Sequence, residues 1–326
     1  ATDSSAYGNH TRGVLNGNTP LATQVYYTIT STGNAADFGD LTEGRRLPNG
    51  AGNETRGLTA GGYKSSGTTY YNIIDFNTIM STGTAVDFGD LTLARYGSNG
   101  GTASPTRALF AGGYGGSNSD IIDFVQISTT GNAVDFGDVS SAKYGYQGCS
   151  SSTRAVFSGG ELSSLQFVTI ASQGNTIDYG DLNSGNLINA GSTSNSKTGI
   201  VGGGNNGSNI NIIDHFQIPT GGKAIDFGDL SAARQELSAT SQSHGGLSDG
   251  YNGTRETYIQ GAGRAFIQGG TGATALLQEH IIPTLGNTSS FGNLTVARQD
   301  TTGFSSTIRA YAAGGISPSF EDEIDY

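Results

Sequence analysis

Thr106-Arg-Ala-Leu-Phe-Ala-Gly-Gly-Tyr114 opens a composite motif that continues as Ile121-Ile-Asp-Phe124 and closes as Asn132-Ala-Val-Asp-Phe-Gly-Asp138. The three segments recur in this order along nearly the whole chain. The first segment has seven versions, the second has seven, of which the last is cut short, and the third has six. A module repeated this often around one molecule indicates a scaffold rather than an active site.

The spacing of the copies predicts the architecture. The third segment ends in an Asp residue, and successive copies of it are 50, 48, 43 and 48 positions apart: Asp40, Asp90, Asp138, Asp181 and Asp229. A period of about 40 to 50 residues with four short strands per unit is typical of β-propeller blades. We therefore predict a seven-bladed propeller, with six blades as the alternative, made of four-stranded antiparallel blades.

The fourth strand of each blade comes from Gly- and Ser-rich stretches between the copies, such as residues 94–103. Small residues suit a strand beside the propeller axis, where neighbouring backbones crowd together.

The composition agrees with an all-β chain. Of 326 residues, 53 are Gly and 34% are hydrophobic, and no long stretch has the 3.6-residue periodicity of an amphipathic helix. The 15 Tyr and 14 Phe residues recur at fixed offsets, which favours packing over disorder.

Charge and cysteine content exclude several functional classes. The net charge of −11 repels a phosphate backbone, so we expect no nucleic-acid partner. No apolar run approaches the length of about 20 residues that a membrane helix needs, and residues 1–5 lack the pattern of a signal peptide. The single cysteine, Cys149, is predicted to be a small packing residue rather than a reactive thiol.

One unit departs from the repeat. We assign residues 11–326 to a single propeller domain, residues 1–10 to an N-terminal arm or first inner strand, and residues 235–255 to an insertion. Loops that break a repeat often carry its individual function. The insertion is therefore the first candidate for a partner contact, and a tolerated surface excursion is the alternative. Its candidate residues are Gln235, His244, Asp249, Tyr251 and Arg255.

Two sets of charged residues occur about once per unit and become circles in a closed ring. The first set consists of Arg12, Arg56, Arg107, Arg154, Arg264 and Arg309. The second set consists of Asp75, Asp123, Asp214 and Asp325. Ion pairs and carbonyl bonds between blades are the structural interpretation. A ring that binds an anion or a sugar is the functional alternative.

The Asp-Phe-Gly segments have no kinase partner motifs around them, so they indicate punctuation between a strand and a turn. The paired Asp residues, as in Asp37-Phe-Gly-Asp40, could cap turns or bind calcium, and we favour turn capping. The four histidines have no metal-ligand spacing and form no catalytic grouping with Ser or Cys. We expect no cofactor.

The repeats resemble those of kelch propellers: a strand ending in Gly-Gly, an Ile-Asp-Phe strand, and an Arg that opens the next unit. The usual kelch Trp is absent, and the Phe of Asp-Phe-Gly-Asp lies where it is expected. The composite motif over residues 11–326 more closely resembles kelch-like virion and tail-fibre-associated structural proteins of tailed phages, notably marine cyanophages. The resemblance implies a structural or adhesive virion component.

We therefore expect a non-enzymatic virion protein that mediates protein–protein assembly or attachment to host-surface glycans, without membrane insertion and oligomeric within the particle. The alternative is a carbohydrate-binding propeller, favoured by five tyrosines in the loops: Tyr70, Tyr71, Tyr96, Tyr144 and Tyr146. A kelch-fold oxidase ranks third, because its copper site needs a Tyr, His and Cys set that four scattered His and one Cys do not offer.

The last unit stops after its second strand type, whereas the first unit is complete. We expect the last blade to lack its outermost strand, or to receive it from a neighbouring subunit or from further C-terminal residues. Its open edge, with Glu323, Ile324 and Tyr326, is predicted to be a docking site, because an unpaired strand invites pairing.

Overall fold

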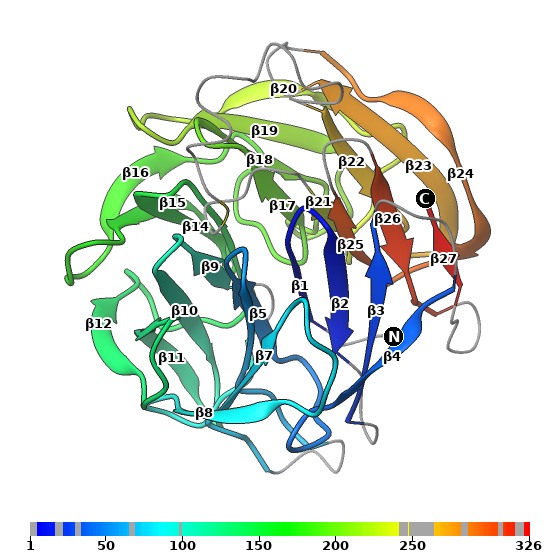
Figure 1. The fold of residues 1–326 in the computed structure, drawn as a ribbon. Helices are drawn as coiled ribbons and strands as arrows, with labels where there is room; N and C mark the ends of the chain where they lie inside the picture. The colour runs from blue at the N-terminus through cyan, green and yellow to red at the C-terminus, as the bar shows by residue number, and fades with distance from the viewer. Residues whose placement is uncertain are drawn as a thin grey trace.

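The computed structural model describes residues 5–16, 22–29, 34–64, 69–97, 100–240, 247, 264–281, 286–305, 309–316 and 323–326. These residues form seven antiparallel sheets arranged as blades around a central axis (Figure 1). The described part of the chain contains no helix, and so none that could cross a membrane. The prediction of an all-β propeller with seven blades is confirmed.

Six blades have four strands, and in each of them the strands follow one another in chain order from the axis outward. Blades 1 to 3 contain β1 (Ala6–Gly8), β2 (Arg12–Asn16), β3 (Thr23–Thr28), β4 (Ala36–Asp40), β5 (Asn49–Gly52), β6 (Arg56–Ala60), β7 (Ile73–Thr78), β8 (Val86–Asp90), β9 (Gly101–Ala103), β10 (Arg107–Tyr114), β11 (Asn118–Gln126) and β12 (Val134–Asp138).

Blades 4 to 6 contain β13 (Tyr146–Ser150), β14 (Arg154–Gly159), β15 (Leu162–Thr169), β16 (Ile177–Asp181), β17 (Gly191–Ser194), β18 (Thr198–Gly202), β19 (Ile212–Gln217), β20 (Ile225–Asp229), β21 (Ser238–Thr240), β22 (Arg264–Gln268), β23 (Thr274–Ile281) and β24 (Ser289–Arg298). Blade 7 has three strands, which are β25 (Thr302–Ser305), β26 (Ala310–Ala313) and β27 (Ile324–Asp325). The expectation of an incomplete last blade is confirmed.

The innermost strands touch their neighbours around the whole ring, from β1 through β5, β9, β13, β17, β21 and β25 back to β1. Glycine makes this approach possible. A Cβ at Gly50 would lie 2.4 Å from the carbonyl oxygen of Ala6, and one at Gly101 would lie 2.3 Å from that of Gly50. The predicted Gly- and Ser-rich strand beside the axis is thus confirmed.

A β-bulge sets the position of each Asp-Phe-Gly-Asp aromatic. In blade 2, Ile74 pairs with Gly89 and Asp75 pairs with Asp87, so Phe88 is the extra residue. The same shift occurs in the other five four-stranded blades. The bulge turns Phe88 toward blade 3, where it packs with Ile127 in a buried cluster. The hydrophobic core therefore lies between blades.

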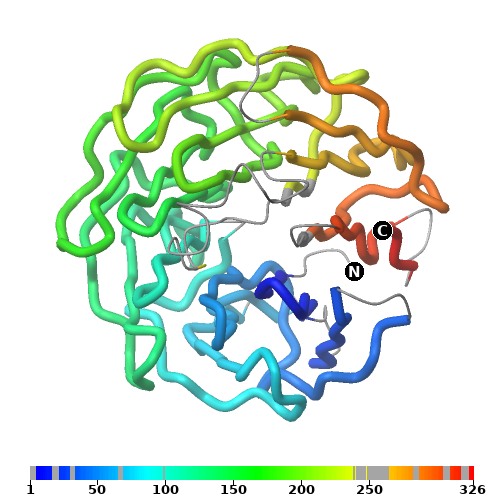
Figure 2. The backbone as a smooth tube through the Cα atoms, turned by 45° about the horizontal axis from the view of Figure 1, so that its top comes forward, coloured from blue at the N-terminus to red at the C-terminus, as the bar shows by residue number. Residues whose placement is uncertain are grey.

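Among the described residues, no strand is exchanged between the two ends of the ring. Blade 1 contains only N-terminal strands and blade 7 only C-terminal ones, and Figure 2 shows them side by side. Tyr311 Oη donates a hydrogen bond of 2.9 Å to the carbonyl oxygen of Ile29, and its ring stacks on Tyr27 at 6.2 Å between centroids. Side-chain packing thus takes the place of a shared blade.

Candidate binding surface at the mouth of the central channel

The Arg set at the start of the second strands bonds to the next blade. Four members donate Nη1–H to a backbone carbonyl there, at 2.8–3.1 Å: Arg12 to Ile79, Arg56 to Ile127, Arg107 to Ile170 and Arg154 to Ile218. Each guanidinium also lies over an aromatic ring of its own blade, as Arg56 does over Phe76 at 4.8 Å.

The last two members of this Arg set differ. Arg264 pairs at 2.9 Å with Glu279, which occupies the position of the aromatic residue in the other blades. Arg309 lies over the Tyr326 ring at 5.3 Å. The whole set therefore makes contacts within the scaffold.

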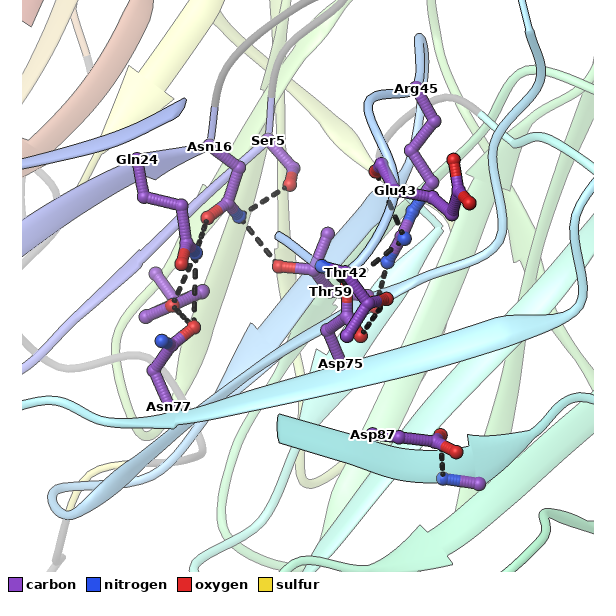
Figure 3. Close-up of polar contacts among 12 residues, drawn as sticks. Ser5, Asn16, Gln24, Thr42, Glu43, Arg45, Thr59, Asp75, Asn77 and Asp87 are labelled. Atoms are coloured by element: carbon purple, nitrogen blue, oxygen red, sulfur yellow. Dashed lines mark hydrogen bonds and ion pairs between the residues drawn. The ribbon is translucent and has the colours of Figure 1, made fainter. Parts of the chain in front are cut away.

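The Asp set pairs with a second group of arginines that the sequence interpretation did not single out. Arg45 reaches Asp75 at 3.0 Å and Arg95 reaches Asp123 at 2.8 Å, and all four side chains are buried. Figure 3 shows Arg45 and Thr42 converging on Asp75, with Thr42 Oγ1 donating at 2.7 Å. Ion pairing therefore does not join the two sets named above.

This second group lies at Arg45, Arg95 and Arg234, in the linkers that lead into inner strands, and at Arg298, the last residue of β24. Arg298 pairs with Asp325 at 2.6 Å, and Arg234 donates to Gln278 at 2.5 Å. Asp214 has no arginine at this point and instead accepts from the Ser184 hydroxyl at 2.5 Å. Burial raises the pKa of Asp214 and lowers that of Arg45, which Asp75 partly offsets.

The first Asp of four Asp-Phe/Tyr-Gly-Asp segments accepts a hydrogen bond from the Gly amide two residues later, for example from Gly89 to Asp87 at 3.0 Å. The Asp side chain therefore bonds a nearby backbone amide, as expected, but it caps the bulge within the outer strand rather than a turn. Within the described ranges, no group of three His, Cys, Asp or Glu residues is arranged to hold a metal ion.

Cys149 is buried, and burial raises the pKa of its thiol to about 12. The thiol therefore stays protonated at neutral pH, which suits the predicted packing role.

Five tyrosines that take no part in the contacts above lie close together. We call them the tyrosine cluster: Tyr63, Tyr70, Tyr96, Tyr114 and Tyr144. Its ring centroids are 4.9 Å apart for Tyr63 and Tyr96, 5.6 Å for Tyr96 and Tyr114, 5.8 Å for Tyr70 and Tyr114, and 6.5 Å for Tyr114 and Tyr144. The rings come from blades 2 and 3 and from the linkers into blades 3 and 4. The rings therefore meet because blades 2, 3 and 4 pack against one another in a fixed register.

Backbone pairing fixes the centre of the cluster. The amides and carbonyls of Tyr96 and Tyr114 exchange two hydrogen bonds of 3.0 and 2.8 Å. Tyr63 and Tyr70 face each other across a second isolated bridge, and the Arg46 guanidinium lies 5.5 Å from the Tyr63 ring. Tyr144 is 38% exposed, and the other four are partly buried. Burial and the neighbouring tyrosines raise the pKa of Tyr96, so it stays neutral at physiological pH.

Three of the five tyrosines that we nominated from the sequence belong to this cluster. The prediction for Tyr146 is wrong, because its ring is buried between blades and its hydroxyl donates to the Ser141 carbonyl oxygen at 2.8 Å. Tyr71 is half-buried beside Tyr70. Tyr63 and Tyr114 were missed, although both follow a Gly-Gly pair at the end of a first segment.

The cluster borders the mouth of the central channel. A cavity of about 460 Å³ there is lined by Tyr96, Tyr144, Asn189, Glu236 and Asp300, among others. Asn189, Glu236 and Asp300 have φ of 55–57° and lie two residues before an inner strand. The mouth is thus aromatic on the side of blades 3 and 4 and acidic on the side of blades 6 and 7.

The predicted insertion contributes to this mouth through Glu236, Leu237 and Ala239, which line the cavity. Its Gln235 Nε2 donates a hydrogen bond to Glu236 Oε1 at 3.4 Å. Its candidates His244, Asp249, Tyr251 and Arg255 lie outside the described residues. Leu247 is described, is buried, and lines a second channel cavity of about 220 Å³.

The residues predicted at the last blade edge lie on or beside β27. Ile324 packs against the cluster formed by Leu15, Tyr27 and Tyr311, and Tyr326 is 65% exposed. The carbonyl oxygen of Glu323 accepts a hydrogen bond from the Gly314 amide at 3.1 Å.

No protein-family model and no curated protein matches the sequence of this chain.

Proposed function

We propose that this propeller is a non-enzymatic binding module of a tailed-phage particle and that the tyrosine cluster is its contact surface. The observation that carries the proposal is the gathering of five tyrosine rings from consecutive blades, two of which, Tyr96 and Tyr144, line the cavity at the channel mouth. The repeated charged residues, by contrast, are engaged between blades and in linkers.

Binding rather than catalysis is supported by where the titratable groups lie. The buried carboxylates Asp75 and Asp123 are held by arginine and threonine, and the Cys149 thiol is buried and protonated. A catalytic group instead needs a perturbed pKa in an accessible cleft. A rigid ring with a decorated end is the usual arrangement of a recognition scaffold.

Carbohydrate recognition is the second candidate, and the cluster favours it directly. A tyrosine offers a flat apolar face and a hydroxyl at one end, which suits a ligand with both apolar and hydroxylated faces. Tyr144 is the most exposed ring, and the carboxylates of Glu236 and Asp300 across the mouth can accept hydroxyl donors. Host-surface attachment would then use a glycan.

The virion assignment is supported by the resemblance of the composite repeat to phage kelch-like proteins and is tested by location. Purified native particles would be probed by mass spectrometry and by electron microscopy with an antibody against the chain. We expect the chain at fixed copy number on the outside of the particle. Its absence from purified particles would remove the virion assignment and leave the tyrosine cluster proposal standing.

A further inference from the structure

The outer strands of the propeller are linked into a belt. At the junction of blades 1 and 2, the amides of Gly83 and Ala85 donate to the carbonyls of Phe38 and Asp40 at 2.6 and 2.7 Å. The same pair of bonds joins blades 2 to 3, 3 to 4, 4 to 5 and 5 to 6, at 2.7–3.1 Å. The hairpin before each outer strand therefore docks on the outer strand of the preceding blade.

Glycine makes this docking close. The Gly residues of the first five outer strands have φ of 132–151°, and a Cβ on any of them would lie 2.3–2.7 Å from the backbone of the next hairpin. The docked hairpin also covers the aromatic residue that precedes this Gly in each outer strand. Phe38, Phe88, Phe136, Tyr179 and Phe227 are only 1–5% exposed. Four of them pack with an Ile of the following blade, as Phe38 does with Ile79.

The sixth outer strand, β24, departs from all five. Phe291 stands at the position of Phe38 and is 52% exposed. Gly292, which follows it, lies outside the left-handed region and has no atom within 4 Å of a built Cβ. Among the described residues, no amide of blade 7 bonds to the carbonyl of Phe291 or Asn293.

The uncovered part of β24 lies next to the incomplete blade 7. β27 pairs with β26 on one side, and no described strand pairs with it on the other. Its backbone is nevertheless held in place, because Asp325 accepts from Arg298 at 2.6 Å and from the Thr295 amide at 3.0 Å. Strand β27 lies next to β24 (Figure 1). An organised strand edge and the exposed Phe291 therefore flank one gap in the belt.

We propose that this gap is a docking site for an extended segment with the chemistry of the repeat's own outer strand. That segment carries an apolar residue to cover Phe291, then Gly and a small residue whose amides reach the carbonyls of Phe291 and Asn293. An Asp-Phe-Gly-Asp strand follows and pairs along β27. The five complete junctions of this molecule are the template for each of these contacts, and strand addition to an open edge is an established mode of recognition.

A second copy of the chain does not fit the gap. The outer strands β4, β8, β12, β16 and β20 are each bonded on one side within their blade and on the other to the next hairpin. A second copy could offer one of these strands only by breaking the hydrogen bonds between that strand and the next hairpin within the same molecule. The site is separate from the tyrosine cluster, so it stands or falls independently of the proposed function.

The test uses a synthetic peptide with the sequence of residues 78–92, which supplies the hairpin and outer strand of blade 2. Titration calorimetry with the intact chain should show saturable binding of one peptide per chain. Hydrogen exchange should slow at residues 289–294 and 323–326. A peptide with Phe88→Ala and Gly89→Val should bind at least tenfold more weakly.

Protein variants locate the binding. Phe291→Asp should weaken peptide binding at least tenfold and is expected to fold, because the residue is already half exposed. Ile177→Asp is the matched control, since Ile177 is a 60% exposed apolar residue on the complete outer strand β16, and it should bind as the unaltered chain does. Absence of peptide binding, or equal binding by Phe291→Asp, would overturn the proposal. Sedimentation showing a dimer that protects residues 289–294 would replace the segment with a second copy.

Discussion

At the residue scale, three arginine and carboxylate pairs hold one blade to the next: Arg45–Asp75, Arg95–Asp123 and Arg298–Asp325. Arg95 donates to Asp123 at 2.8 Å and also to the carbonyls of Gly112 and Phe110, at 2.7 and 3.1 Å. One guanidinium therefore joins a linker to two strands of a blade.

Replacing Arg95 by Leu should lower the free energy of unfolding by about 3–5 kcal/mol, because Asp123 would remain buried without its counter-ion. The measurement is urea-induced unfolding followed by fluorescence. Arg264→Leu is the matched control, since its pair with Glu279 is partly exposed and should contribute about 0–1 kcal/mol. Equal losses of unfolding free energy in the two variants would show that burial of the ion pair does not determine its contribution to stability.

His280 gives the propeller a pH dependence. Its side chain is only 2% exposed and lies 3.7 Å from the Phe227 ring, and burial lowers its pKa to about 4, with a smaller contribution from His215. An unfolded histidine titrates near pH 6.5. Between about pH 6.5 and pH 4 the unfolded chain therefore binds a proton that the folded chain does not.

Stability should thus be unaffected by His280 above pH 6.5 and should fall by up to about 3 kcal/mol as the pH drops to 4. Urea midpoints at pH 7 and pH 4.5 test this, with His280→Leu as the comparison. The variant should lose less stability on acidification than the unaltered chain. An equal loss in both would assign the acid sensitivity to other groups.

The sequence indicated residue roles unevenly. The recurrence of Arg and Asp once per unit was visible, but the partners were not. Asp123 pairs with Arg95 in the preceding linker rather than with Arg107 of its own blade, and only the path of the linker determines that choice. Gln replaces the Asp of this set at position 278, opposite Arg234, and at position 166 in blade 4, whereas Asp214 keeps the Asp without an arginine partner, so the sequence does not track this second group.

At the scale of elements, the outer strand is the part of the blade that the sequence predicted best. The recurring Asp-Phe-Gly-Asp segment marked where this strand lies and indicated the bond of its Asp to a nearby amide, but it did not indicate the bulge that turns the aromatic toward the next blade. What the pattern could not give is the docking of the next hairpin on that strand, because this contact joins glycines 37 to 58 positions apart, such as Gly39 and Gly83.

Gly89 and Gly292 occupy equivalent positions in two outer strands, but only Gly89 is covered by a docked hairpin. Substituting each of them therefore tests whether the docking requires glycine. Gly89→Ala should lower stability by about 2–4 kcal/mol, because φ is 142° and the new Cβ would lie 2.4 Å from the carbonyl oxygen of Gly131. Gly292→Ala should change it by less than about 0.5 kcal/mol, since nothing lies within 4 Å. Thermal unfolding of both variants checks the contrast, and a neutral Gly89→Ala would contradict the belt.

At the scale of the whole molecule, the period of the repeat predicted the fold class and the blade number. It did not predict how the ring closes, which depends on the packing of Tyr311 against Tyr27 and on its bond to Ile29. Nor did it predict the tyrosine cluster as a unit. Tyr70 and Tyr96 were visible as loop tyrosines, but Tyr63 and Tyr114 meet them only because neighbouring blades are stacked in register.

The central claim is that this cluster is the binding surface. The most direct measurement compares the unaltered chain with the triple variant Tyr70→Ser, Tyr96→Ser and Tyr144→Ser on arrays of glycans and of purified particle proteins, in the presence of saturating peptide 78–92 so that the gap beside β27 is blocked. Ile225→Ser serves as control, because it removes a 48% exposed apolar side chain of the outer strand β20, which belongs to neither the tyrosine cluster nor the gap beside β27. We predict that every ligand held by the unaltered chain binds the triple variant at least tenfold more weakly and the control equally. A ligand that binds the triple variant undiminished, or an unaltered chain that binds none, would contradict the account.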